Sequence, residues 1–292
     1  MPAFYPLPPP GPIKAGAPCA AIVAADVERA LAEDIGSGDA SAALVDASGI
    51  GEAVVLAREP MVLAGRAWFD ACVRALDPDC LIDWAFGDGD AVPANAQLCA
   101  IRARSRALLS GERSALNFLQ TLSGTATTTA AYVARTLGSN TRLLDTRKTL
   151  PGLRYAQKYA VKVGGGENHR LGLYDAVLIK ENHILAAGGI GPAIARARAL
   201  WPALLVEIEV ESLAEYFEAL AARPDRIMLD ELSMDDMKSA VAARPPGIQL
   251  EVSGSIDQDR LQALCALGVD YISIGALTKH VRAIDLSLRW RS

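Results

Sequence analysis

The fold is decided by residues 204–275, which read LLVEIEVESLAEYFEALAARPDRIMLDELSMDDMKSAVAARPPGIQLEVSGSIDQDRLQALCALGVDYISIG. Four short apolar runs rich in β-branched residues stand out in this stretch, and helix-compatible segments lie between them. This alternation predicts strands joined by helical crossovers, which is typical of a parallel sheet. The predicted strands are 204–210, 226–230, 248–253 and 271–275.

Two more strands are predicted upstream, at 142–146 and 176–180. Residues at the ends of the last five strands are spaced by 29, 21, 23 and 22 residues, which is the length of one strand–helix unit; the residues counted are Lys180, Glu209, Asp230, Ser253 and Gly275. So many repeats favour an open (β/α) barrel, with an open doubly wound sheet as the structural alternative. The helices predicted within the repeats are 192–200, 213–222, 234–243 and 259–267.

Charged residues fall where three of these strands end. Lys180, Glu209 and Asp230 each occupy the last positions of an apolar strand. A charged side chain in such a strand is costly unless it faces a site, and the carboxyl ends of barrel strands form the active-site face. Capping of the following helices is the alternative explanation, and it suits Asp230 best.

Positive charge is concentrated in residues 142–180, although the 292-residue chain has a formal net charge of −5. This segment holds eight Lys or Arg against three Asp or Glu, a local balance of +5, so the rest of the chain sums to −10. Such a chain is expected to hold small anions, whereas a nucleic-acid binder is more often basic over a wide face.

The basic segment contains motifs suited to anions. Arg147 and Lys148 follow a strand, and Gly164–Gly166 leads to Asn168–Arg170. Arginine matches a carboxylate through two parallel hydrogen bonds and lysine supplies a compact charge, so together they suit a ligand with several acidic groups. His169 is the stronger binding candidate, and His183 reads as structural. A solvated corner at Arg147–Lys148 and a flexible glycine linker remain open alternatives.

The remaining composition bounds the class of protein. No run of 18 apolar residues is present, so no transmembrane helix is expected. The five cysteines form no CxxC pair and read as free thiols of a reducing compartment, which predicts a cytoplasmic location. The start holds six prolines in twelve residues and predicts a polyproline-like or disordered arm over residues 1–20, with no signal peptide.

Several segments resemble quinolinate phosphoribosyltransferase, the nicotinate-nucleotide pyrophosphorylase (carboxylating) family. The resemblance runs from about Val27 to the C-terminus, and the order of RKT, GGG, NHR and IKxNH is its most specific part. The segments that carry it are ERSALNFLQTLSGTAT, DTRKTLPGLR, KYAVKVGGGENHRLGLYDAVLIKENHI, VEIEVESL, MLDELS, LEVSGSI and DYISIGALT.

The resemblance implies an α/β protein with two domains. An N-terminal α/β sandwich domain would span residues 21–115 and be joined by the C-terminal tail 283–292, and an open (β/α) barrel of parallel strands would span residues 116–282. It also implies a homodimer, possibly a higher oligomer, in which Arg113 reaches the partner's site. No nucleic-acid or membrane partner is expected.

The implied reaction joins quinolinate to phosphoribosyl pyrophosphate, giving nicotinate mononucleotide, pyrophosphate and carbon dioxide in de novo NAD biosynthesis. Mg²⁺ would accompany the donor, with no protein metal ligand assigned. A paralogue acting on another ring acid, a Schiff-base lyase using Lys180 and a non-enzymatic binding protein are the alternatives.

The resemblance also implies roles for individual residues. Arg113, Arg147, His169 and Arg170 would bind quinolinate, with Lys148 and Lys180 close to both substrates. Glu209 and Asp230 would bind the ribose, and these two acids with Lys148 and Lys180 form the expected catalytic set. The phosphate end would use Ser253, Gly254, Ser255, Gly275 and Ala276.

Overall fold

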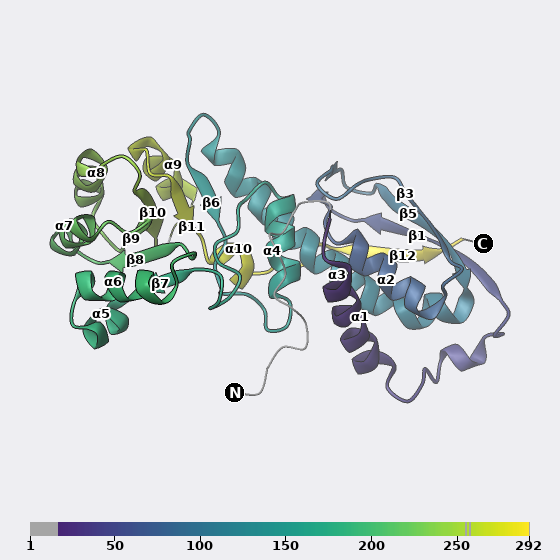
Figure 1. Ribbon diagram of the computed structural model, residues 1–292. Helices are drawn as coiled ribbons and strands as arrows, with labels where there is room; N and C mark the ends of the chain where they lie inside the picture. The colour runs from purple at the N-terminus through teal and green to yellow at the C-terminus, as the bar shows by residue number, and fades with distance from the viewer. Residues whose placement is uncertain (1–16, 255, 257, 292) are drawn as a thin grey trace. The chain divides into compact units, whose positions relative to one another are not determined.

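The computed structural model describes residues 17–254, 256 and 258–291, and the predicted arm up to residue 16 lies outside that range. Contacts divide the chain into two compact units (Figure 1). The first comprises the described residues up to Ala130, the segment Thr149–Gly165 and the residues from Leu277 onward. The second comprises Ala131–Lys148 and Gly166–Ala276.

The first unit is built on a four-stranded antiparallel sheet. Its order is β12-β1-β5-β3, so a strand from the end of the chain adds to an edge of a sheet made near its start. Alternate residues of β1 are buried, as expected for a sheet with one face against a core. The strands are β1 (Ile50–Ala57), β3 (Leu81–Trp84), β5 (Gln97–Arg104) and β12 (Leu286–Trp290).

Helices complete the first unit. Trp68 on α2 is fully buried and donates its indole N–H to Asp26 of α1 at 2.9 Å, which satisfies both polar groups. A short ladder pairs β2 (Met61–Val62) with β4 (Ala91–Val92). The helices are α1 (Ala20–Ile35), α2 (Arg66–Leu76), α3 (Ser105–Val133), α4 (Arg154–Val163) and α10 (Ala276–Lys279), the last of which begins at the junction of the two units.

The predicted domain boundary at 115/116 falls inside α3. This helix runs unbroken for 29 residues, and its buried positions continue on both sides of residue 115. A continuous buried stripe keeps all but the last three residues of the helix with one core, so the contacts change from one unit to the other only after Ala130.

The second unit confirms the predicted parallel barrel architecture. Its six strands are all parallel in the order β6-β11-β10-β9-β8-β7, and helices follow the strands along the chain (Figure 1). The first two strands of this unit in the sequence, β6 and β7, are the two edge strands of the sheet, so the barrel is open between them. The strands are β6 (Arg142–Leu144), β7 (Val177–Ile179), β8 (Val206–Val210), β9 (Arg226–Asp230), β10 (Gln249–Ser253) and β11 (Tyr271–Ser273).

The barrel helices start at recognisable signals. Ser212 and Ser233 accept hydrogen bonds from the backbone N–H groups of Glu215 and Asp236, which caps the first turns of α7 and α8. The helix α5 was not predicted, because its seven residues are too few to show a helical period. The helices are α5 (Glu181–Ala187), α6 (Ile190–Leu200), α7 (Leu213–Ala222), α8 (Met234–Ala243) and α9 (Gln258–Leu267).

A loop occupies the free edge of β6. Glu167 forms a parallel bridge with Leu144, donating its N–H to Leu143 O at 2.7 Å and accepting from Asp145 N–H at 3.1 Å. These hydrogen bonds fix the start of the segment that continues into Asn168, His169 and Arg170. Across the described part of the chain, no helix has the length and apolar character needed to cross a membrane.

One glycine of α3 sets a close backbone approach in the first unit. A Cβ on Gly124 would lie 2.1 Å from the carbonyl oxygen of Arg282, whereas a Cβ on Gly191 of α6 would meet nothing within 4 Å. We expect Gly124→Ala to lower the free energy of unfolding by about 1–3 kcal/mol through overpacking.

The matched variant Gly191→Ala is expected to be neutral or to stabilise by up to about 1 kcal/mol, because alanine favours a helix. Urea unfolding followed by circular dichroism measures both. Equal effects of the two substitutions would contradict the close approach at Gly124.

Candidate active site at the carboxyl ends of the barrel strands

The second unit gathers most of the predicted site residues at one edge of its sheet. Lys148 follows β6 and Lys180 follows β7, while Glu209 is the penultimate residue of β8. Asp230 and Ser253 end β9 and β10, and their Cα atoms are register partners. Because the strands are parallel, these residues share the carboxyl-end face.

Lys180 and Glu209 form an ion pair at this face. The two side chains come from neighbouring strands, and the lysine is half-exposed while the glutamate is mostly covered. The backbone N–H of Lys180 donates to His183 Nδ1 at 3.0 Å, so His183 stabilises the first turn of α5. The lysine is therefore anchored at its backbone and directed by the carboxylate across the strand.

Three carboxylates cluster beside this pair. One carboxylate oxygen from each of Glu209, Glu211 and Asp230 lies within 4.8 Å of the others. Desolvation, followed by repulsion from the surrounding carboxylates, raises the pKa of Glu211. Such a group of oxygen acceptors can hold sugar hydroxyls or a hard divalent cation.

Lys148 lies against the loop that follows β11. A Cβ on Gly275 would be 2.9 Å from the Cδ atom of Lys148 and 3.7 Å from its Nζ atom. The backbone N–H of Lys148 donates to Thr146 Oγ1 at 3.1 Å. Gly275 therefore leaves space for the lysine, and the two loops that flank the β6–β11 pair meet at the site.

The loop carrying Asn168, His169 and Arg170 is fixed by a buried carboxylate. Asp145, which directly follows β6, accepts from Asn168 Nδ2 at 2.6 Å and from the His169 backbone N–H at 3.0 Å. Burial, with a further contribution from Arg147, lowers the pKa of Arg170. Arg147 thus disfavours the charged form of Arg170, whereas Glu207 and Asp175 favour it.

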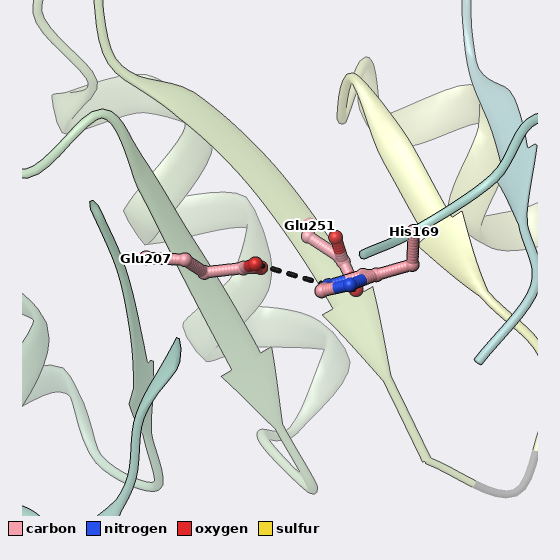
Figure 2. Close-up of side chains that lie close together, drawn as sticks. All are labelled: His169, Glu207 and Glu251. Carbon is pink, nitrogen blue, oxygen red and sulfur yellow. Dashed lines mark ion pairs between the residues drawn. The ribbon is translucent and has the colours of Figure 1, made fainter. Parts of the chain in front are cut away.

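His169 reaches into the barrel interior, where it meets two buried glutamates (Figure 2). Its Nε2 atom lies 3.0 Å from Glu207 Oε2 and 3.5 Å from Glu251 Oε1. Arg226 contacts the other oxygen of Glu251 at 2.9 Å and lies over the Tyr271 ring at 4.1 Å. A layer of polar side chains thus fills part of the barrel where branched apolar residues are usual.

Burial has a strong effect on these two acids. Desolvation raises the pKa of Glu251 to about 7, and the neighbouring Glu207 carboxylate adds to the rise. Desolvation likewise raises the pKa of Glu207, although Arg226 opposes the change.

The sequence predictions missed this interior layer. Its members are strand residues whose side chains face inward below the strand ends: Glu207, Arg226, Glu251 and Tyr271. A signal was present, because Glu207 and Glu209 are two residues apart in one apolar strand and therefore share a face. Glu251 gave a second signal, because it is an acid in the middle of an apolar strand, where an unpaired charge is costly.

Two of the three consecutive glycines have separate structural reasons. A Cβ on Gly164 would lie 2.5 Å from Ala126 O, so this residue allows α4 to pack closely on α3 within the first unit. Gly165 has φ of +89° and turns the chain after α4. The backbone turn before Asn168 therefore needs no ligand to explain it.

Two predicted site residues stand apart from this description. Arg113 lies on α3 in the first unit and is exposed. Ser255 lies outside the described residues, while Gly254 and Ala276 follow β10 and β11 beside Ser253 and Gly275. The roles of all these residues stay predictions.

The open barrel and its rim of cations and carboxylates define a (β/α) barrel enzyme built for small anions. The sequence matches "Quinolinate phosphoribosyl transferase, N-terminal domain" over residues 39–123 and "Quinolinate phosphoribosyl transferase, C-terminal domain" over residues 125–289. The chain belongs to the quinolinate phosphoribosyl transferase family, which confirms the resemblance found in the sequence.

Known relatives match over nearly the whole chain. The nicotinate-nucleotide pyrophosphorylase [carboxylating] of Mycobacterium leprae is 39% identical over 272 residues, covering 90% of this chain and 95% of the relative. The Homo sapiens protein of the same name is 38% identical, covering 91% of each chain. The solved nicotinate-nucleotide pyrophosphorylase from Francisella tularensis superposes with a TM-score of 0.91 at 45% identity, covering 95% of this chain and 99% of that one.

The raised pKa of Glu251 predicts a pH dependence of stability. The folded protein holds this proton up to about pH 7, whereas a glutamate in the unfolded chain releases it near the ordinary value of 4.5. The folded state binds the proton more tightly, so the contribution of Glu251 to stability is largest below pH 4.5. It is expected to fall by up to about 3 kcal/mol as the pH rises to 7, and then to level off.

Glu251→Gln should remove this part of the pH slope, because an amide does not titrate. Urea unfolding between pH 5 and pH 8 measures the slope, with the exposed Glu218→Gln variant as the control. Identical slopes in Glu251→Gln and the parent protein would contradict the burial of an ionisable carboxyl.

Proposed function

We propose that this chain transfers the phosphoribosyl group of phosphoribosyl pyrophosphate to quinolinate with decarboxylation. The products are nicotinate mononucleotide, pyrophosphate and carbon dioxide, a step of de novo NAD biosynthesis. Family membership supports the reaction, as do the names of relatives that match about nine-tenths of the chain. The structural observation that carries the proposal is one strand-end face holding both a cationic loop and a pair of strand-end carboxylates.

Quinolinate, the acceptor, has two carboxylates, and the loop residues Arg147 and Arg170 could each bind one of them. Burial lowers the pKa of Arg170 and repulsion from Arg147 adds to the fall, so an anion bound by both arginines would oppose the repulsion. Arginine can grip a carboxylate through two parallel hydrogen bonds, which fixes the plane of the ring acid as well as its position. Lys148 would add a compact charge on the side of the β11 loop.

The donor would be held by the neighbouring strand ends. Glu209 and Asp230 accept hydrogen bonds from the ribose hydroxyls, and Lys180 lies at the ion pair with Glu209. The backbone after β10 and β11, at Ser253–Gly254 and Gly275–Ala276, would offer N–H groups to the phosphate. Phosphate sites of (β/α) barrels commonly use the loops after the final strands.

The chemistry needs no protein nucleophile. The C1–oxygen bond to pyrophosphate breaks as the pyridine nitrogen bonds to C1, and the sugar becomes oxocarbenium-like. Glu209 and Asp230 stabilise that positive charge, while Lys148 and Lys180 offset charge on the departing pyrophosphate. The quaternary ring nitrogen then accepts electron density as the adjacent carboxylate leaves as carbon dioxide, and solvent supplies the replacing proton.

Mg²⁺ is part of the proposal and would accompany the donor. The carboxylates of Glu209, Glu211 and Asp230 are hard oxygen ligands grouped within 4.8 Å, so they fit such a cation beside the ribose. The ion would supply charge neutralisation on the leaving pyrophosphate.

A homodimer also belongs to the proposal, with Arg113 of each chain reaching the partner's site. The exposure of Arg113 on a helix outside the barrel unit supports this role. A cytoplasmic location is proposed on the five free cysteines, of which Cys72 and Cys99 are fully buried.

Loss of Arg147, which is proposed to bind a carboxylate of quinolinate, should abolish the reaction while the fold is kept. Arg147→Ala is expected to lower kcat/KM for quinolinate by at least about 100-fold, the loss of roughly 3 kcal/mol of charged hydrogen bonding. The control is Arg196→Ala, an exposed arginine of α6. Release of nicotinate mononucleotide and carbon dioxide is measured together, and a wild-type protein that releases neither would overturn the proposed function.

The shared site predicts complementation between two inactive variants. A dimer that pairs Arg113→Ala with Arg147→Ala keeps one site with both arginines intact. Random mixing of equal amounts should therefore restore about a quarter of the wild-type activity. No recovery after subunit exchange, with mixed dimers shown by mass spectrometry, would exclude a site completed by the partner.

A further inference from the structure

The ring of His169 is held from three directions within the second unit. Its backbone N–H donates to Asp145 Oδ1 at 3.0 Å, and its Nδ1 atom accepts from the Arg170 backbone N–H at 2.8 Å. Its Nε2 atom faces Glu207 at 3.0 Å and Glu251 at 3.5 Å (Figure 2). The side chain is only 8% exposed, so these contacts decide its orientation.

The contact at Nδ1 selects one protonation state. A nitrogen that accepts an N–H bond carries no proton, so the proton of the neutral ring lies on Nε2. An imidazolium would need a second proton on Nδ1, where the Arg170 N–H already points. The geometry therefore favours a neutral ring that presents its Nε2–H to the glutamates.

The two glutamates are placed to receive that proton donor. They come from β8 and β10 on either side of β9, and neither side chain is more than 1% exposed. Both oxygens of Glu207, Oε1 of Glu251 and Nε2 of His169 are buried without a hydrogen bond of full geometry to any described residue. Buried polar atoms of this kind are costly. The Nε2 atom lies close to both acids, and the proton that Glu251 keeps up to about pH 7 is a second donor within this group.

The other end of the pair is anchored by Arg226. Its Nη1 atom contacts Glu251 Oε2 at 2.9 Å, its Nη2 atom contacts Gln249 Oε1 at 3.3 Å, and its guanidinium lies on the Tyr271 ring. These contacts join β9 to β10 and β11, so the Glu251 carboxylate is held by the barrel wall and not by a loop.

We propose that Glu207 and Glu251 are positioning residues for the acceptor acid. They share the Nε2–H of His169 and hold the imidazole in one plane, while the Arg170 N–H that donates to Nδ1 favours the neutral ring and ties it to the backbone at Arg170. The loop that grips the acid is thereby tied to the barrel strands. The identity of the acid as quinolinate rests on the proposed function, whereas the hydrogen-bonding state of His169 does not.

A divalent cation held by His169, Glu207 and Glu251 is the competing arrangement, since their ligand atoms lie within 4.8 Å of one another. A metal would take the lone pair of Nε2 and move the ring proton to Nδ1. That nitrogen faces an N–H donor, so the observed contact opposes the cation.

The first test measures by ¹⁵N NMR which imidazole nitrogen of His169 carries the proton in the unmodified protein, with His169→Asn used to assign the signal. The expected spectrum shows a protonated Nε2 and an unprotonated Nδ1. A proton on Nδ1, alone or together with one on Nε2, would overturn the proposal. This result needs no turnover and no glutamate variant.

The second test compares steady-state kinetics of Glu207→Gln and Glu251→Gln with the exposed control Glu218→Gln. Each interior variant is expected to raise the KM for quinolinate about tenfold, or about 1.4 kcal/mol. The KM for the sugar donor and kcat should change less, and the imidazole signal should move. A folded interior variant with unchanged KM for quinolinate and an unchanged imidazole signal would overturn the positioning role.

The two tests separate the two proposals. A wild-type protein that does not turn over quinolinate would defeat the proposed function, and the NMR spectrum would still decide the state of His169. If an interior variant fails to fold, the spectrum of the unmodified protein decides alone.

Discussion

Charge inside a (β/α) barrel must be paired within the barrel, because water cannot reach it there. In this chain Glu207 and Arg226 are register partners on β8 and β9, and Glu251 and Tyr271 are register partners on β10 and β11. The strands thus bring two acids, the Arg226 guanidinium and the Tyr271 ring on which it lies into one layer. The rim residues above depend on that layer, since His169 reaches from the rim into it.

Charged groups at the rim of the barrel are also held by partners. Lys180 is paired with Glu209, and Asp145 holds the backbone of the loop that carries His169 and Arg170. Arg147 repels Arg170, whereas Glu207 and Asp175 attract it, and a bound acid would oppose the repulsion. Paired charges therefore hold the site in shape, and the two arginines are the residues that we propose to bind its ligand.

The sequence predicted the barrel well because period and spacing are local properties. The four strands from Leu204 onward and their helices lie within a few residues of the predicted positions. The strands at 142–146, 176–180 and 271–275 are shorter than predicted, because their polar or glycine ends turn into the loops of the site. The interior layer was missed, since inward-facing pairs form only when separate strands come into register, as Glu207 on β8 and Arg226 on β9 do.

We propose that Arg147 and Arg170 together make this site specific for an acid with two carboxylates. The decisive measurement is calorimetric titration of the protein with quinolinate and with nicotinate, which has one carboxylate. Quinolinate is expected to bind at least about tenfold more tightly than nicotinate, a difference of about 1.4 kcal/mol, and this advantage should shrink as salt is added. Equal affinities for the two acids at low salt would contradict it.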